Sequence, residues 1–284
     1  MRFRAICLII CSLCAAQNAY ALEICGDMTQ GELILIKDQK ALNIKIKNNL
    51  GVKNYKPDAT GVTLVALHRD APRKILFETI SPHDSAAVYE MEVSPQKWDI
   101  QYINGVSSAK VTPTSETDLK EIRREQADVG RAVSHYVAGD AWRKGFILPI
   151  DGRISGRFGN QRVFNGVPKS SHTGVDIAAA EGTPVKASGD GKVILNGKDY
   201  FYTGNMVIID HGQGLQTIYA HLKEAYVKAD DVVKQGDIIG LVGKTGRATG
   251  AHLHWGASIN GVRFSPHSLL DINAKTCEKI EENQ

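Results

Sequence analysis

The stretch His252-Leu253-His254-Trp255 places two imidazoles two positions apart, each followed by a large apolar residue. Side chains of a β-strand alternate between its two faces, so residues two apart share a face, with α-carbons about 6.5–7 Å apart. Leu253 and Trp255 are therefore expected to pack into a core, while His252 and His254 point together to the other side. Two imidazoles side by side on an open face indicate that something binds them.

A second stretch, from Ser171 to Ile177, follows the same logic. His172, Gly174 and Asp176 fall on one face of an expected strand. The glycine between the two potential ligands leaves room for a metal ion that both side chains can reach. Imidazole nitrogen and carboxylate oxygen are both usual zinc ligands, at about 2.0–2.2 Å. Two histidines, one carboxylate and a position kept for water are typical of catalytic zinc sites, whereas structural sites are more often closed by cysteines.

A third histidine, His221, closes the segment Tyr219-Ala220-His221-Leu222. Alone it is a weak signal, because a single histidine at the end of a strand is usually structural. In company, the segments H-x-x-x-D, Y-A-H-L and H-x-H predict a metal site within one domain. His211 and His267 lie in predicted turns and are expected to be surface residues without a part in that site.

The C-terminal half of the chain is rich in glycine and in β-branched residues. Turn signals such as Asn196-Gly197 separate apolar runs at 193–195, 206–209, 216–219 and 238–242. This alternation predicts a glycine-rich antiparallel β domain over residues 145–272.

The N-terminal half shows a different pattern. Short alternating runs between residues 31 and 111 predict a small antiparallel β domain, sandwich or barrel, over 22–112. After Pro113 the apolar period changes to three and four residues, and Ser115 with Asp118 resembles a capping box. A helix over about 116–137 is therefore expected within a helical connector at 113–144, and residues 273–284 are left as a C-terminal tail. The predicted fold class is mainly β.

Residues 1–21 have the features of a secretory signal. Two arginines precede an apolar run at 5–16, and Ala19-Tyr20-Ala21 offers a small-x-small cleavage site. The run is shorter than the about 20 apolar residues that a membrane span needs, and no later segment offers one, so no membrane span is expected. Lipidation at Cys11 or Cys14 is the weaker alternative, because bulky residues precede both.

Two cysteines, Cys25 and Cys277, remain after that segment. In an oxidising compartment they are expected to form a disulfide, with two free thiols as the alternative. Each lacks a nearby second cysteine, which argues against metal binding. The net charge of +3 requires neither nucleic acid nor an anionic membrane as a partner.

Taken together, these motifs resemble those of the LytM or lysostaphin-type zinc metallopeptidases, peptidase family M23. The likeness covers about residues 145–271 and runs through GRISGRFG (152–159), HTGVDIAA (172–179), IDHGQGL (209–215), YAHL (219–222) and TGRATGAHLHWG (245–256). The resemblance implies that His172, Asp176 and His254 bind Zn²⁺, and that His221 and His252 stand beside the metal-bound water. Ala180 and Ala251 occupy positions where relatives commonly carry proline, but neither change removes a reactive group.

The resemblance also implies the reaction, which is hydrolysis of peptide cross-links between peptidoglycan stem peptides, with D,D-endopeptidase cleavage as the first expectation. An exported enzyme fits that polymer, in the periplasm first and secreted second. The motif H-E-x-x-H and its glutamate base are absent. His252 or His221 is therefore expected to act as general base and later acid, while the other stabilises the oxyanion. The spacing leaves open which is which.

Two alternatives remain. The chain could be a noncatalytic LytM-type regulator that activates a murein amidase, which would tolerate the loss of His221 and His252. In the other alternative the N-terminal domain is an inhibitory propeptide, with a side chain from residues 22–165, for example that of Asn160, in the open zinc position.

Overall fold

The computed structural model describes residues 22–38, 43–48, 51–80 and 87–280, so the predicted signal at 1–21 lies outside the described residues. The chain divides into two compact units, one formed by the residues up to Gln96 with those from Ala274 onward, and the other by Lys97–Asn273. Strands dominate both units, which confirms the prediction of a mainly β fold.

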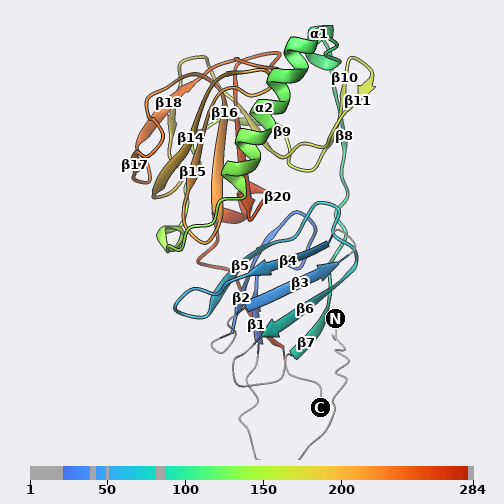
Figure 1. Cartoon of the computed structure of the whole chain (residues 1–284), viewed down its shortest axis with the longest axis vertical. Coiled ribbons are helices and arrows are strands. Elements are labelled where there is room, and N and C mark those ends of the chain that lie inside the picture. Colours follow the sequence, from blue (N-terminus) through green and yellow to red (C-terminus); the bar gives the residue numbers. More distant parts are fainter. Residues whose placement is uncertain (1–21, 39–42, 49–50, 81–86, 281–284) are drawn as a thin grey trace, which may run out of the picture. The chain divides into compact units, whose positions relative to one another are not determined.

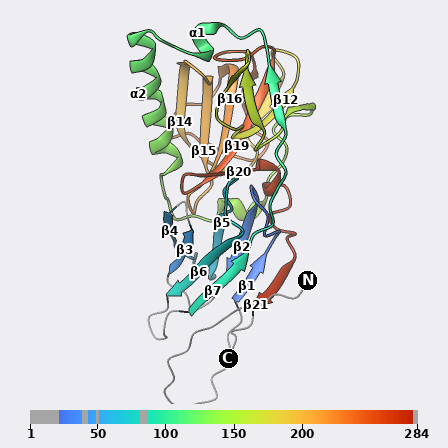
Figure 2. The same cartoon turned by 90° about the vertical axis from the view of Figure 1, so that its right-hand side faces the viewer.

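The first unit consists of two four-stranded antiparallel sheets, with strand orders β21-β1-β2-β5 and β4-β3-β6-β7. Figure 2 shows β21 beside β1 at the edge of the first sheet. The strands are β1 (Leu22–Cys25), β2 (Leu33–Lys37), β3 (Asn43–Asn48), β4 (Gly51–Tyr55), β5 (Val62–Ala66), β6 (Lys74–Ile80), β7 (Ala87–Glu92) and β21 (Cys277–Ile280).

Both sheets contribute to one apolar core. Ile34 and Ile36 enter it from one sheet, and Ile44 and Phe77 enter it from the other. Strand β21 lies within residues 273–284, which the sequence left as a tail, and it pairs with β1 along its whole length. The register places Cys25 opposite Cys277, and the two form a disulfide, as predicted.

The second unit is built on a ten-stranded antiparallel sheet. Its main path runs β17-β14-β15-β16-β19-β12-β9, with β13, β18 and β20 paired off it; β8, β10 and β11 form a separate small sheet. The strands are β8 (Ile100–Ile103), β9 (Arg153–Gly156), β10 (Gln161–Phe164), β11 (Val167–Pro168), β12 (Gly174–Ala178), β13 (Pro184–Lys186), β14 (Gly191–Tyr200), β15 (Gly204–Asp210), β16 (Leu215–Ala225), β17 (Val232–Val233), β18 (Ile238–Val242), β19 (His252–Ile259) and β20 (Val262–Phe264).

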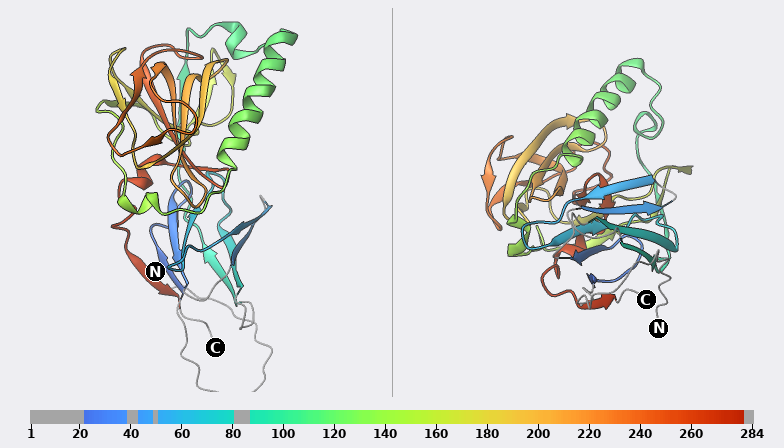
Figure 3. Two further views of the ribbon diagram at one scale, coloured as in Figure 1. Left: turned by 60° about the vertical axis from the view of Figure 1, so that its left-hand side comes forward. Right: turned by 60° about the horizontal axis from the view of Figure 1, so that its bottom comes forward.

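A long helix covers one face of this sheet (Figure 1, and Figure 3 from other sides). It is α2 (Glu116–Val133), and the Ser115 side chain accepts a hydrogen bond from the Asp118 N–H at its start, as a capping residue does. Its apolar side packs on β14, β15 and β16 through Ala132 and Val133. The other helices are α1 (Ser108–Val111), η1 (Ala141–Lys144) and η2 (Pro266–Leu269). No described helix is both long and apolar enough to cross a membrane.

Helix α2 ends at Val133, earlier than the predicted residue 137. The segment after it leaves the helical path because its carbonyls bond to the sheet instead. The His135 carbonyl accepts from Gln216 Nε2, and the Val137 carbonyl accepts from the Gln213 N–H.

Residues 97–112 lie with the second unit, whereas the sequence placed them with the first. Strand β8 pairs in parallel with β10, and the register sets Gln101 opposite Arg162. The Lys110 ammonium of α1 then donates to the carbonyls of Phe201 and Gly246. Backbone pairing and the hydrogen bonds of the Lys110 ammonium thus join this segment to the second unit.

Candidate metal centre

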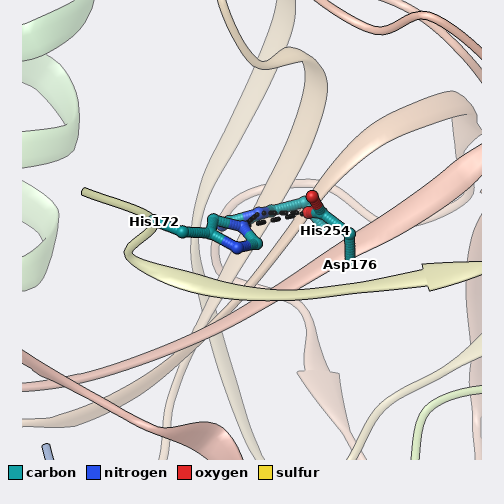
Figure 4. A group of neighbouring side chains, drawn as sticks. All are labelled: His172, Asp176 and His254. Atoms are coloured by element: carbon teal, nitrogen blue, oxygen red, sulfur yellow. Dashed lines mark hydrogen bonds and ion pairs between the residues drawn. The ribbon is translucent and has the colours of Figure 1, made fainter. Parts of the chain in front are cut away.

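Two neighbouring strands bring the predicted ligands together. In the antiparallel pair β12–β19, Asp176 lies directly opposite His254, so the two side chains share one face of the sheet. His254 Nδ1 lies 3.0 Å from Asp176 Oδ1. Figure 4 shows His172 meeting both of them. Its Nε2 atom lies 2.9 Å from His254 Nδ1 and 3.1 Å from Asp176 Oδ1.

The positions of His172 and of the space beside Gly174 differ from the prediction, which put His172 on the strand and a metal ion in that space. His172 precedes β12, which begins at Gly174, so it reaches the centre from a loop and not from the strand. A Cβ atom at Gly174 would lie 2.8 Å from the Nε2 and Cε1 atoms of His254. The space beside Gly174 therefore holds the His254 ring, and the glycine allows the ring to reach the other two ligands.

Hydrogen bonding fixes which nitrogen of His172 faces the centre. Its Nδ1 lies 3.0 Å from the Arg157 carbonyl oxygen, which can only accept, so Nδ1 carries the proton and Nε2 presents a lone pair. Burial lowers the pKa of His172 to about 4, despite the opposing effect of Asp176. The ring is thus neutral at pH 7, the form in which imidazole binds metals.

Asp176 is ionised although it is buried. Burial on its own would raise the pKa of this carboxyl, but its close contacts with His172 and His254, and the charge of Arg162, bring the pKa well below its usual range. Burial also lowers the pKa of His254. Two neutral imidazoles and one carboxylate therefore face a common point.

This donor set fits a metal ion. Within the described part of the chain, one group of three or more His, Cys, Asp or Glu side chains has all its ligand atoms within 4.8 Å of one another. It consists of His172, Asp176 and His254. Tetrahedral zinc with bonds of about 2.0–2.2 Å separates its ligand atoms by about 3.3–3.6 Å. The three atoms need to move apart by only a few tenths of an ångström to admit an ion.

The other two predicted residues lie beside this group. The ring of His221 is 4.7 Å from that of His252 and 6.1 Å from that of His254, between centroids. His221 Nδ1 lies 2.8 Å from the Thr245 carbonyl and His252 Nδ1 lies 2.9 Å from the Gly250 carbonyl. Both rings therefore carry a proton on Nδ1 and leave Nε2 free. The Nε2 atom of His252 lies 3.8 Å from Asp176 Oδ1.

A local irregularity of β16 orients His221. The pairing of β15 with β16 shifts register between Asn205 and Val207, and His221 has a φ of 62°, uncommon for a residue other than glycine. Its N–H donates to the Thr203 carbonyl. Bulges of this kind redirect side chains beside functional sites. Burial, with His252 nearby, lowers the pKa of His221 to about 3.

One prediction about the remaining histidines is wrong. His211 is fully buried and is not a surface residue. Its Nδ1 donates to the Asp190 carbonyl at 2.6 Å and its Nε2 lies 2.7 Å from Thr217 Oγ1, so both ring nitrogens are satisfied inside the sheet. The turn composition around it hid this burial. His267 is exposed, as expected.

Sequence reasoning missed Arg162 and Gln101. The Arg162 guanidinium contacts Asp176 Oδ2, and its Nε donates to Gln101 Oε1 at 3.3 Å. The one available signal was an arginine next to two apolar residues, Val163 and Phe164, which does not identify the anion that it contacts. Asn160, the example of an inhibitory side chain under the propeptide alternative, contacts His172 through its main chain, where its carbonyl accepts the His172 N–H.

Comparison with known proteins agrees with this geometry. Residues 170–266 match the model of Peptidase family M23. The DD-carboxypeptidase/endopeptidase Mpg of Neisseria meningitidis serogroup B is 50% identical over 98 residues, which are 34% of this chain and 22% of that protein. The peptidoglycan DD-endopeptidase ShyA of Vibrio cholerae serotype O1 is 40% identical over 150 residues, 51% of this chain and 34% of that protein. The matches thus span a fifth to a third of the length of these relatives.

The likeness in fold extends further along the chain. The crystal structure of a peptidase M23 from Pseudomonas aeruginosa superimposes with a TM-score of 0.63 at 26% identity, covering 85% of this chain and 94% of that one. The family match contains His172, Asp176, His221, His252 and His254. Residues 170–266, which lie within the second unit, thus match the family of M23 peptidases.

Proposed function

We propose that the chain is a zinc-dependent endopeptidase that hydrolyses peptide cross-links of bacterial peptidoglycan. The observation that carries this proposal is the convergence of His172 Nε2, Asp176 Oδ1 and His254 Nδ1 at 2.9–3.1 Å from one another. Three lone pairs that meet at one point repel one another unless a proton or a cation lies between them. Two more imidazoles beside this point supply groups that can move protons.

His172, Asp176 and His254 would hold the ion. Bound zinc supplies Lewis-acid polarisation of a carbonyl and lowers the pKa of a water molecule to about 7. Three protein ligands leave a fourth tetrahedral position for solvent or substrate, as in catalytic zinc sites.

His221 and His252 would move the protons. Because each ring donates its Nδ1–H to a main-chain carbonyl, each Nε2 is an acceptor in the neutral state. One of these atoms takes the proton of the attacking water and later returns it to the leaving amine. The imidazole at the other position would donate to the oxyanion of the tetrahedral intermediate after taking up a proton from solvent on Nε2.

The proposed proton transfers do not involve Glu181. Glu181, the acidic residue nearest in sequence to Asp176, faces the ammonium groups of Lys223 and Lys244 at 3.9 and 3.4 Å.

The relatives support the choice of substrate. ShyA is a peptidoglycan DD-endopeptidase and Mpg a DD-carboxypeptidase/endopeptidase, so a D,D cross-link between stem peptides is the proposed bond. Such a substrate lies outside the cytoplasm. The disulfide between Cys25 and Cys277 agrees with export to an oxidising compartment, which we propose to be the periplasm.

The test is mass spectrometry of purified cross-linked muropeptides after incubation with the purified chain. We expect the dimers to give monomers with the uptake of one water for each bond cut. A chelator should stop the reaction and added Zn²⁺ should restore it. Dimers that survive incubation with the zinc-loaded chain would refute the proposal.

The regulatory alternative makes a different prediction for His221 and His252. A noncatalytic activator should stimulate a murein amidase equally well as the parent chain and as the His221→Ala and His252→Ala variants. The hydrolase should lose its own cleavage in both variants while it still binds Zn²⁺.

A further inference from the structure

The two oxygens of Asp176 have different partners. Oδ1 faces the histidines, at 3.1 Å from His172 Nε2 and 3.0 Å from His254 Nδ1. Oδ2 accepts a hydrogen bond from Nη2 of Arg162, whose side chain is 15% exposed. A guanidinium has five N–H donors and no lone pair, so Arg162 cannot bind a metal and contacts the centre only through Asp176.

We propose that Arg162 is a positioning residue of the metal centre, and that it makes Asp176 bind through Oδ1 alone. The inference rests on the proposed zinc-dependent function. A carboxylate can bind a cation through one oxygen or two. The hydrogen bond from Arg162 holds Oδ2 away from the ion, so the fourth position stays open for water or substrate.

The surroundings of Oδ2 support this role. In the pairing of β9 with β12, Gly156 lies opposite Asp176, and a Cβ atom at Gly156 would lie 2.7 Å from Oδ2. Glycine at this position lets the carboxylate turn its second oxygen toward β10, where Arg162 lies. Any side chain there would push Oδ2 from its place.

Gln101 in turn holds Arg162. Arg162 Nε donates to Gln101 Oε1 at 3.3 Å, and Gln101 Nε2 donates to the Ser155 carbonyl at 3.0 Å. The parallel pairing of β8 with β10 sets these two residues side by side. One chain of hydrogen bonds therefore runs from β8 through Arg162 to Asp176, and its first two members precede the family match at 170–266.

The test uses Co²⁺ in place of zinc, because the visible absorption of Co²⁺ reports its coordination number. The full chain loaded with Co²⁺ should show the intense bands of a four-coordinate ion. In Arg162→Met, Asp176 is free to bind through both oxygens, and the bands should weaken to those of a five-coordinate ion. Arg162→Lys keeps a charged donor and should restore part of the intensity.

Two further variants keep the test decisive. Gln101→Leu leaves Arg162 in place but removes its support, and should shift the spectrum in the same direction by a smaller amount, even if Arg162→Met fails to fold. Arg153→Met replaces an exposed arginine of β9 and should leave the spectrum unchanged.

The outcomes separate this inference from the proposed function. A parent chain that binds no Co²⁺ or Zn²⁺ would refute the metal centre, and both proposals with it. Full loading with an unaltered spectrum in Arg162→Met and Gln101→Leu would overturn the role of Arg162 alone, whatever happens to the hydrolysis of muropeptides.

Discussion

Replacing Gly174 by alanine tests the packing on which the metal centre depends. The added Cβ would lie 2.5 Å from the Trp255 carbonyl oxygen and 2.8 Å from the His254 ring. Overpacking of a tight site costs about 1–3 kcal/mol. Here one obstacle is a main-chain oxygen of the paired strand, which cannot rotate away, so we expect about 2–3 kcal/mol. For a unit of this size that lowers Tm by about 4–12 °C.

The same change should displace the His254 ring from the other two ligands. We expect the affinity for Zn²⁺ to fall by about 10–100-fold, the range found when a support of a ligand is lost. Circular dichroism during heating, with and without Zn²⁺, measures the stability, and competition with a chelator measures the affinity. Gly130→Ala in α2 is the matched control, because nothing lies within 4 Å of its added Cβ. It should raise the free energy of unfolding by up to about 1 kcal/mol, because alanine favours a helix more than glycine does. If Gly174→Ala melts and binds zinc like the parent, the His254 ring does not occupy the space assigned to it.

Three other predictions concern the metal, the buried histidine and the loops beside the site. Zn²⁺ at 1,000 times its Kd should stabilise the chain by about 4 kcal/mol; His172→Ala and His254→Ala should abolish that gain in a thermal shift assay, whereas His221→Ala and His252→Ala should retain it. Burial holds the pKa of His211 at about 4, below the value of about 6.5 in the unfolded chain. As pH drops, the unfolded chain therefore takes up this proton first. The free energy of unfolding should fall between about pH 6.5 and 4, by up to about 3 kcal/mol from this residue. Urea unfolding should show a shallower pH dependence in His211→Gln, and an unchanged slope would contradict the burial argument. Lys110→Met removes the ammonium that donates to Phe201 and Gly246. It should slow muropeptide cleavage several-fold at unchanged zinc content. The control Lys120→Met, on the exposed side of α2, should leave the rate unchanged, and equal rates in the two variants would count against a role for these loops.

Strand periodicity predicted much of the sheet but not its pairing. The expected run at 238–242 coincides with β18 (Ile238–Val242), and the expected run at 206–209 lies within β15. The alternation of apolar and polar residues along a strand shows which of its faces is buried, and residues adjacent in sequence are enough to reveal it. The partner of a strand depends on distant residues. Strand β8, which lies within the domain predicted over 22–112, therefore belongs to a different unit from the one expected.

The candidate site shows the same division. The pattern of His252 to Trp255 correctly placed Leu253 and Trp255 in the core, where both are fully buried. The convergence of Asp176 with His254 follows from the β12–β19 register, and spacing alone does not determine register. Arg162 could not be assigned, because its partner is fourteen positions away on a strand that is not its neighbour in the sheet.

Residues that precede the family match support the proposed catalytic groups from two sides. Arg162 donates to Asp176 Oδ2, and Gln101 accepts a hydrogen bond from Arg162. On the other side, Lys110 and Glu125 bind the main chain of Phe201, through its carbonyl and its N–H.

The second support reaches His221 through two short loops. Phe201 lies two residues before Thr203, and the Thr203 carbonyl accepts the His221 N–H. Gly246, the other partner of Lys110, follows Thr245. The Thr245 carbonyl accepts the Nδ1–H of His221. A histidine with a φ of 62° keeps that conformation only while its surroundings hold it. The proposed reactive groups lie within the family match, but we expect their orientation to depend also on residues 97–133. Substitutions there should change the rate of the proposed hydrolysis without removing a ligand.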